Sequence, residues 1–412
     1  MENLTDFNVI PTDWEKRIST IKVIGVGGGG CNAVNYMFEQ HIEGCIFIVC
    51  NTDSQSLNSC SVPVKIQLGE GLGAGCDPVA GRNAALESEA EIENSVFGSK
   101  TDMLFITAGM GGGTGTGAAP VIAAMAKKKG ILTVGVVTIP TRSEGNEAMT
   151  KALDGIMEME KNVDSLLVID NEKLYKYYGK VLVQDAYPMS NEVLCTAVKG
   201  IIEIIKKEGY INVDFKDVET MMKNSGMALM GSGVGSGKNR IEDAVKAAFE
   251  SPLLNDFDLK TAKKVLVNIT CGHNEQGITM DDLNMINKKI DEYTGRANNF
   301  KRGLIWDDDP EIGDTIRITS IVTGLKFSDV IGATRDMGNY IMIGKDFSYD
   351  KSRMASSEGI SLFADSGSQQ IGYNTKSNVR KFRFDPDECP CLASGENLSE
   401  LETVPAIRRI QS

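Results

Sequence analysis

The stretch MLFITAGMGGGTGTGAAP, residues 103–120, decides the fold. Its apolar start, Met103–Ile106, predicts a buried parallel strand, and its alanine-rich end predicts a helix with Pro120 in the first turn. A strand, a glycine loop and a helix N-terminus bind phosphate well, because bare N–H groups approach the oxygens and the helix end adds partial positive charge. Threonine hydroxyls are further expected donors. The predicted phosphate-binding residues are Gly109, Gly111, Gly112, Gly113, Thr114, Gly115, Thr116 and Gly117.

Two more glycine-rich loops precede this one. TIKVIGVGGGGCNAVNYM (20–37) predicts a strand, a loop and a helix that begins near Asn32, and GEGLGAGCDPVAGRNAA (69–85) predicts a loop that opens a helix at Asp77–Pro78. The first loop fits GxGxxG and is followed by Asp53 at the end of the next predicted strand. That pattern is a weak signal of dinucleotide binding, so a dinucleotide-dependent oxidoreductase remains an alternative function. The 109–117 loop favours one nucleotide held by two loops instead.

Composition limits the class of protein. The chain has 412 residues, 42% of them hydrophobic, nine cysteines and a net charge of −13. Without an apolar run of membrane-spanning length or a signal-peptide pattern at the start, we expect a soluble protein with no direct membrane insertion. The negative charge argues against nucleic acid as a partner. The scattered, odd-numbered cysteines favour reduced thiols and a cytoplasmic location.

GGGTGTG at 111–117 resembles the signature loop of the tubulin superfamily, and the whole sequence resembles the FtsZ family of tubulin-like cell-division GTPases. The resemblance implies GTP or GDP as the ligand, Mg²⁺ held by phosphates and water rather than by protein ligands, and a head-to-tail homopolymer that builds cytokinetic Z-ring filaments. In the first loop it assigns nucleotide contacts to Gly27, Gly28, Gly29 and Asn32, and in the third to Ala74 and Gly75. Toward the sugar and base it assigns Glu144, Asn171, Tyr187 and Asn191, although Tyr187 and Asn191 could also serve adenine.

Two segments depart from the family pattern, the third glycine loop near 69–75, which is a few residues shorter than expected, and the stretch after Pro140. After Pro140 the chain lacks two expected aromatic residues, and Ala148 stands where an arginine is expected. A charge-assisted bond from arginine to phosphate contributes about 1.5–3 kcal/mol. Arg142 and Lys151 are both candidates to replace the missing arginine. The absence of this arginine motivates an alternative function, a structural filament protein that binds GTP with little or no hydrolysis.

YINVDFKDVETMM (210–222) carries Asn212, Asp214 and Asp217 in the family's catalytic pattern. An aspartate before a helix is by itself more often an N-cap than a catalyst. Two acids three residues apart can also project toward one water, and the glycine loops hold no obvious base. The resemblance implies that these residues act in trans, on GTP bound to the neighbouring subunit, and Asp214 and Asp217 argue against the non-hydrolysing alternative.

The chain is predicted to be an α/β protein in six parts. A Rossmann-like, parallel-sheet GTPase domain (20–185) follows an N-terminal arm (1–19), and a long central helix (186–209), expected from near Ser190 toward Gly209, leads to a smaller α+β domain (210–325). That domain is predicted to contain strands at 265–271 and 315–325, helices at 239–250 and 279–294, and a loop at 231–239. A variable, partly disordered linker (326–401) precedes ETVPAIRRIQS (402–412). By resemblance this peptide docks onto membrane-tethering proteins at the division site, with a plain tail as the alternative.

Overall fold

The computed structural model describes residues 19–172, 174, 183–207, 209–251, 254, 259–274, 277–295, 297, 299–307, 312–325, 340–342 and 348–350. The chain divides into two compact units, residues 1–364 and 365–412, and all described residues belong to the first. The expected arm up to residue 18 and the tail peptide at 402–412 lie outside the described residues, as does the linker except for a two-stranded pair, β12 (Tyr340–Met342) with β13 (Ser348–Asp350).

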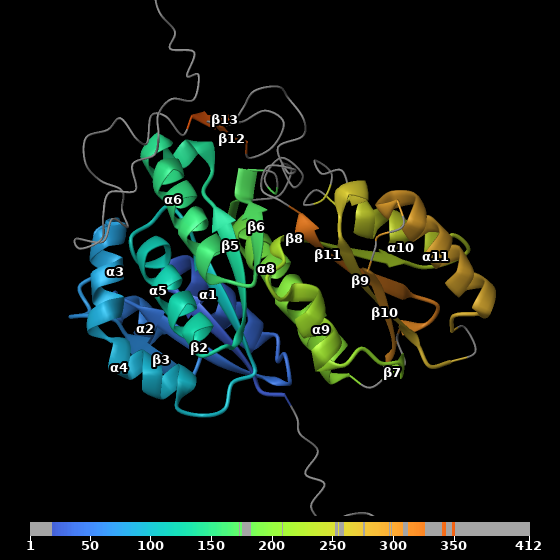
Figure 1. Cartoon of the computed structure of the whole chain (residues 1–412), viewed down its shortest axis with the longest axis horizontal. Helices are drawn as coiled ribbons and strands as arrows, with labels where there is room; N and C mark the ends of the chain where they lie inside the picture. The colour runs from blue at the N-terminus through green and yellow to red at the C-terminus, as the bar shows by residue number, and fades with distance from the viewer. Residues whose placement is uncertain are drawn as a thin grey trace, which may run out of the picture. The chain divides into compact units, whose positions relative to one another are not determined.

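One sheet of eleven strands runs through the described part of the first unit (Figure 1). Its strand order is β3-β2-β1-β4-β5-β6-β8-β11-β9-β10-β7, and neighbours from β3 to β8 are parallel. The parallel part comprises β1 (Ile21–Val26), β2 (Cys45–Asn51), β3 (Val64–Gln67), β4 (Met103–Gly109), β5 (Leu132–Ile139), β6 (Ser165–Asp170) and β8 (Gly226–Gly235). The rest is mixed and comprises β7 (Gly209–Ile211), β9 (Lys264–Gly272), β10 (Asn299–Asp307) and β11 (Ile316–Leu325).

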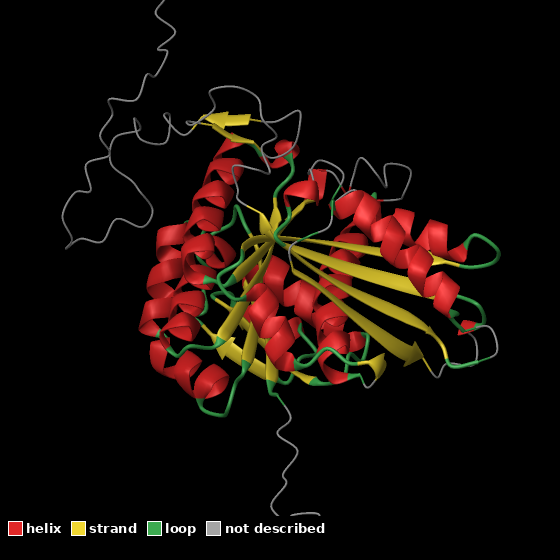
Figure 2. Cartoon of the chain, turned by 45° about the vertical axis from the view of Figure 1, so that its right-hand side comes forward, coloured by secondary structure: helices red, strands yellow, loops and turns green. Residues whose placement is uncertain are grey.

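Alternate residues of the parallel strands bury opposite faces of the sheet. In β1, Ile21 and Val23 pack with α1 (Gly27–Glu39) and α8 (Val183–Lys206), whereas Ile24 and Val26 belong to the core under the helices of the other face. Those helices are α3 (Pro78–Glu87), α5 (Thr114–Lys128) and α6 (Asn146–Asn162). Helices therefore cover the sheet on both sides (Figure 2), as parallel strands with two apolar faces require.

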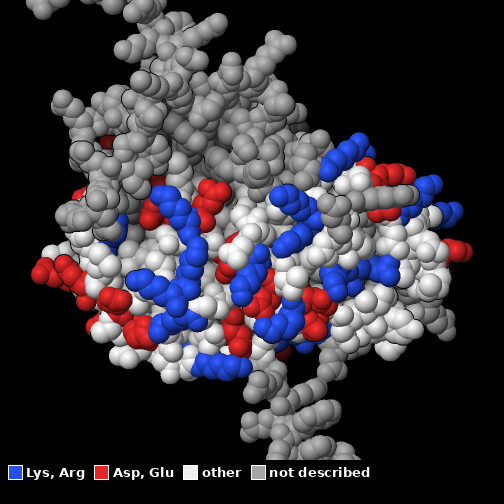
Figure 3. Space-filling view, in the orientation of Figure 1, with Lys and Arg blue, Asp and Glu red and all other residues white. Residues whose placement is uncertain are grey.

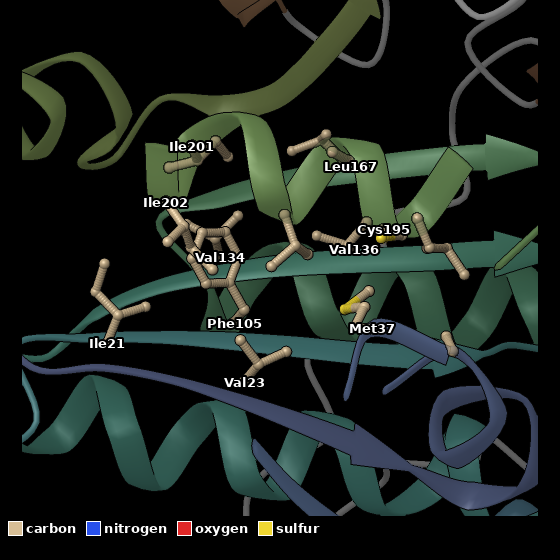
Figure 4. Close-up of a cluster of buried hydrophobic side chains, with 14 of the residues drawn as sticks. Ile21, Val23, Met37, Phe105, Val134, Val136, Leu167, Cys195, Ile201 and Ile202 are labelled. Carbon is tan, nitrogen blue, oxygen red and sulfur yellow. The ribbon is translucent and has the colours of Figure 1, made fainter. Parts of the chain in front are cut away.

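The central helix α8 is anchored over the middle of the sheet. Its Cys195, Ile201 and Ile202 belong to one buried cluster with Phe105 and Val134 of the neighbouring strands β4 and β5 (Figure 4). At its C-terminal end, Lys206 donates to the carbonyl of Ser19, just before β1 begins. Because the parallel strands begin at that edge, α8 spans the sheet from its carboxyl edge to its amino edge.

The remaining described elements are short connections and the helices of the mixed part. They are α2 (Ser54–Ser59), α4 (Glu89–Ile92), the π-helical turn η1 (Glu93–Phe97), the 3₁₀ turns η2 (Arg142–Glu144) and η3 (Leu259–Thr261), α9 (Phe215–Met222), α10 (Arg240–Phe249) and α11 (Met280–Thr294). The predicted helices at 239–250 and 279–294 are thus confirmed. A capping box begins α11: Thr279 Oγ1 accepts from the Asp282 amide, and Asp282 accepts from the Thr279 amide.

The boundaries of four elements differ from the sequence prediction. Helix α1 begins at Gly27 rather than near Asn32, and α5 begins at Thr114, which moves Pro120 from the expected first turn to the seventh helical residue. The central helix runs from Val183 to Lys206 instead of from near Ser190 to Gly209. Residues 231–235 belong to strand β8, so the loop predicted at 231–239 is wrong in its first half.

Close packing explains why these glycine runs adopt regular structure. A Cβ at Gly30 would lie 2.3 Å from the Thr107 carbonyl oxygen, and one at Gly117 would lie 2.0 Å from that of Pro78. In β8, a Cβ at Gly231 would lie 1.8 Å from the Ala248 carbonyl oxygen of α10. The glycines therefore let helices lie directly on neighbouring backbone. The sequence predicts loops at these glycines because glycine is also typical of turns.

Candidate functional site

A cleft of about 560 Å³ lies at the carboxyl ends of the parallel strands. Parallel α/β sheets bind their ligands at this edge. Twelve residues assigned to the nucleotide from the sequence line it: Gly28, Gly29, Asn32, Ala74, Gly109, Gly112, Gly113, Thr114, Gly115, Glu144, Asn171 and Asn191. The structure thus brings together residues that are up to 163 positions apart in the chain, from Gly28 to Asn191.

Five other assigned glycines and threonines support the loops and do not line the cleft: Gly27, Gly75, Gly111, Thr116 and Gly117. Tyr187 lies in α8, but its side chain is outside the described residues. The sequence assignment left out eleven lining residues: Asn51, Thr52, Asp53, Ser56, Gly73, Cys76, Met110, Thr138, Pro140, Ser190 and Leu194. Thr138 and Pro140 could have been found, because they come at the carboxyl end of the predicted strand 131–140.

The three glycine loops pack directly on one another. A Cβ at Gly29 would lie 3.3 Å from the Gly109 Cα, which joins the first and second loops. A Cβ at Gly113 would lie 2.8 Å from that of Ala74 in the third loop. Gly27 adopts a φ of +71°, a left-handed conformation that favours glycine, where it meets the N-terminus of α5. The loops form one continuous wall because side chains are absent at their contacts.

The N-termini of α1 and α5, neither of which has a side-chain cap, lie in these glycine loops. Neither α1 nor α5 has a side chain that accepts a hydrogen bond from its first turn. The first four N–H groups of an α-helix have no partner within the helix, and the helix dipole adds partial positive charge there. Two such ends side by side in one cleft are suited to bind the phosphates of a nucleotide.

The two threonines of the second loop play different parts. Thr114 lines the cleft, and its Oγ1 lies 2.6 Å from Thr52 Oγ1, so that the loop is joined to the end of β2. Thr116 is fully buried and accepts a hydrogen bond from the Gly111 amide at 2.9 Å. Gly111 has a φ of +103°, and the Thr116 hydroxyl therefore holds the loop in that conformation instead of facing a ligand.

The third loop is clamped to the strand end beside it. The Gly73 amide donates to the Thr52 carbonyl at 2.8 Å, and the Ser54 amide donates to the Gly71 carbonyl. Asp53 Oδ1 accepts from the amides of Gln55 and Ser56 and so caps α2. In a dinucleotide enzyme this carboxylate would instead bind a ribose. Asp53 engages one oxygen as a cap, and this contact alone does not decide between the two kinds of site.

Polar side chains line the opposite side of the cleft. Glu144 is exposed, and its Oε1 accepts from the Thr141 amide at 2.8 Å, which fixes the carboxylate at the end of η2. Asn171 Oδ1 accepts from Ser190 Oγ at 3.0 Å, joining the end of β6 to α8. Asn191 follows on the same helix. These groups offer acceptors and amide donors of the kind that bind a sugar and a base edge.

The three predicted catalytic residues lie at the other end of α8. Asn191 in the cleft and Lys206 are fifteen helical residues apart, a rise of about 22 Å. Asn212 comes after β7 and accepts from the Gly209 amide at 2.7 Å. None of the three lines the cleft. Acids beyond the far end of this rigid helix do not reach a nucleotide bound to the same copy.

Asp214 and Asp217 are organised around the start of α9. Asp214 Oδ1 accepts from the Asp217 amide at 2.7 Å, so the N-cap alternative for Asp214 is confirmed. Asp217 pairs with Lys301 of β10 at 2.7 Å, and this hydrogen bond raises the pKa of the Lys301 ammonium. Asp214 is exposed, and the Asp217 side chain is 31% exposed. A carboxylate can serve as a cap and still present its second oxygen to a partner.

In the part of the chain that is described, no group of three or more His, Cys, Asp or Glu side chains is arranged to hold a metal ion. The cleft instead offers hydroxyl and amide oxygens from Thr52, Thr114 and Asn51. Mg²⁺ keeps several waters and is commonly held through substrate phosphates. The donor set therefore fits a Mg²⁺ ion that arrives with the nucleotide. Among the described residues, every helix is too short or too polar to cross a membrane.

Comparison with known proteins identifies the relatives of this chain. A model of the Tubulin/FtsZ family, GTPase domain, matches residues 20–179, and a model of the FtsZ family, C-terminal domain, matches residues 226–326. The chain is 44% identical over 339 residues to the cell division protein FtsZ of Buchnera aphidicola from Schizaphis graminum, covering 80% of this chain and 86% of the relative. It is 46% identical over 312 residues to that of Pseudomonas aeruginosa, covering 74% and 77%.

Solved structures agree with these matches. An empty FtsZ dimer from M. jannaschii has a TM-score of 0.68 at 37% identity and covers 75% of this chain and 89% of that one. CetZ1 from Haloferax volcanii, bound to GDP, shares the fold with a TM-score of 0.66 at 20% identity, over 76% of this chain and 96% of that one.

Proposed function

The chain belongs to the FtsZ family of tubulin-like GTPases, and from this premise we propose that its cleft binds GTP and that a second copy completes hydrolysis. The phosphates would lie against the N-termini of α1 and α5, with the sugar and base toward Glu144, Asn171, Tyr187 and Asn191. Asn212, Asp214 and Asp217 of the next subunit would face the terminal phosphate. One observation carries the proposal: two uncapped helix ends meet in the cleft, while the acids lie beyond the far end of α8.

The proposed reaction is phosphoryl transfer to water. Such reactions depend on positioning and on electrostatic stabilisation of charge at the phosphate oxygens. The glycine-loop N–H groups and helix ends would supply that stabilisation, and the oxygens of Asn51, Thr52 and Thr114 would help to hold a Mg²⁺ ion that neutralises phosphate charge. Asp214 and Asp217 would orient the attacking water and accept its proton. Because each site takes groups from two copies, hydrolysis requires head-to-tail assembly.

The test measures phosphate release from GTP against total protein concentration for wild type and Asp214→Asn. Asparagine keeps the hydrogen bond to the Asp217 amide and so preserves the start of α9, while the carboxylate charge is removed. We expect the wild-type rate per subunit to rise above a threshold concentration. Asp214→Asn should bind GTP normally and lose hydrolysis by about 10²-fold or more.

Two further variants make this test specific. Asp281→Asn changes an exposed aspartate in the first turn of α11 and should hydrolyse GTP like the wild type. Gly28→Asp places a carboxylate where no atom lies within 4 Å of the added Cβ, and it should block nucleotide binding by charge repulsion. A mixture of Gly28→Asp and Asp214→Asn subunits should hydrolyse GTP although neither does so alone. A rate per subunit that is constant at every concentration, with no gain on mixing, would refute the shared site.

We also propose that residues 402–412 dock onto membrane-tethering division proteins and so bring the filaments to the division site. The peptide ETVPAIRRIQS combines apolar and basic residues within a chain of net charge −13. Short segments of this kind bind partner grooves through a few side-chain anchors.

A further inference from the structure

The cleft has little positive charge of its own. Among its described lining residues there is neither lysine nor arginine, whereas Asp53 and Glu144 are acidic. A nucleoside triphosphate carries several negative charges, and each helix end supplies only about half an elementary charge. A cation at the rim of the cleft would therefore contribute strongly to the binding of the outermost phosphate.

Lys151 of α6 occupies such a position. Its ammonium donates to the Cys76 carbonyl at 2.9 Å, and Cys76 lines the cleft in the third glycine loop. The same ammonium lies 2.6 Å from Glu147 Oε1, and the Lys151 side chain is only 20% exposed. An ammonium has three N–H donors, so these two contacts leave one N–H for another acceptor.

The packing of α6 places the backbone on either side of this lysine beside the second glycine loop. A Cβ at Gly155 would lie 2.6 Å from Thr116 Cγ2 and 3.0 Å from Met110 Sδ. One turn before Lys151, the Ala148 carbonyl lies 3.0 Å from where a Cβ of Gly111 would be. Residues 148, 151 and 155 share one helix face. Lys151 thus lies between the loop that contains Gly111 and the loop that contains Cys76.

We propose that Lys151 donates a hydrogen bond to the outermost phosphate of the bound nucleoside triphosphate and is held there by the Cys76 carbonyl. The inference rests on the proposed function of the cleft. A diphosphate lacks this phosphate, so Lys151 makes the site selective for the triphosphate. Turning toward the ligand costs little, because Glu147 is 80% exposed and exposed ion pairs are weak. The same ammonium then joins the terminal phosphate to the third loop.

The experiment compares the affinities of Lys151→Gln for the non-hydrolysable triphosphate GMPPCP and for GDP. Both are measured by calorimetry with Mg²⁺, below the concentration at which filaments form. We expect GMPPCP binding to weaken about tenfold or more, which corresponds to about 1.4 kcal/mol, and GDP binding to change much less. Lys151→Arg keeps the charge and should retain most of the preference for GMPPCP over GDP.

The matched control is Lys161→Gln. Lys161 lies on the same helix, is 69% exposed and pairs with Glu158 at 2.9 Å, so this change removes an equal charge away from the cleft. Its affinities should equal those of the wild type. If Lys151→Gln weakens GMPPCP and GDP equally, the lysine merely tethers the third loop and the proposal is wrong. Unchanged binding of both nucleotides also refutes it. Failure of the wild type to bind either nucleotide would instead refute the proposed function of the cleft.

Discussion

At the scale of single residues, burial decides what identical groups can do. Thr114 and Thr116 lie two positions apart, yet one hydroxyl lines the cleft and the other is fully buried against the Gly111 amide. Carboxylates differ in the same way. Glu144 is held at the rim by the Thr141 amide, whereas burial raises the pKa of Asp154 on α6 to about 6. Residue type alone therefore does not assign a role.

Asp154 gives a prediction about pH. Its carboxyl has a pKa of about 6 in the folded chain and an ordinary value of 3.8, so the folded chain binds its proton more tightly. This group therefore lowers stability as pH rises from about 4 to about 6, and the loss persists at pH 7. Asp154→Asn should raise the free energy of unfolding at pH 7 by at most about 3 kcal/mol and leave it nearly unchanged at pH 4.

Urea unfolding at both pH values measures this effect. Glu160→Gln is the matched control, because it removes an exposed carboxylate from the same helix. An Asp154→Asn variant that is no more stable than the wild type at pH 7 would contradict the prediction.

At the scale of secondary-structure elements, the glycines set how closely helices approach the loops they support. Gly155 lies inside α6, where alanine is intrinsically favoured by about 1 kcal/mol. The position of an added Cβ, 2.6 Å from Thr116 Cγ2, puts it in steric conflict with a fully buried threonine. Overpacking of this kind costs about 1–3 kcal/mol. The packing cost should therefore outweigh the gain in helix propensity.

We predict that Gly155→Ala lowers the free energy of unfolding by up to about 2 kcal/mol and weakens nucleotide binding, because α6 is pushed away from the 109–117 loop. Urea unfolding without nucleotide and nucleotide titration measure the two effects. For the unfolding measurement, Gly28→Ala is the control, since no atom lies within 4 Å of its added Cβ and its stability should be unchanged or slightly higher. A more stable Gly155→Ala would show that propensity, not packing, dominates at this position.

At the scale of the whole molecule, α8 separates two functions that assembly would reunite. The helix holds the cleft and the acids of one copy at opposite edges of the sheet, so under the proposed function a complete site needs two copies. Both signs of charge occur on the face seen in Figure 3, where basic side chains spread across the middle and acidic ones lie among them and toward the edges. The net charge of −13 therefore does not make this face uniformly acidic.

A prediction for the whole chain concerns the docking peptide. Removal of residues 402–412 should leave GTP hydrolysis and filament sedimentation unchanged, because the described cleft and acids lie between residues 28 and 217. The same deletion should abolish ring formation at the division site, as observed with a fluorescent fusion in cells. The matched control replaces the last residues with a scrambled peptide of equal composition. Normal rings from the truncated protein would contradict the docking proposal.

The sequence alone determined the α/β class, the parallel strands, the three glycine loops, the helices at 239–250 and 279–294 and the family resemblance. These depend on local spacing, since apolar alternation, glycine runs and capping residues act within a few positions of each other. Five of the twelve lining residues named from the sequence, those between Gly109 and Gly115, follow from the pattern of strand, glycine loop and helix, whereas the other seven were assigned by the family resemblance.

Only the tertiary structure decided what depends on contacts between distant segments. The carbonyl oxygens of Thr107 and Pro78 occupy the space of a side chain at positions 30 and 117, so only glycine fits there. The Thr116 hydroxyl accepts from the Gly111 amide and therefore does not face a ligand. The proposed role of Lys151 depends on its hydrogen bond to the Cys76 carbonyl, 75 positions away in the chain. Local sequence limits the conformations of a segment, but the three-dimensional packing determines which atoms face the cleft and which are buried beneath it.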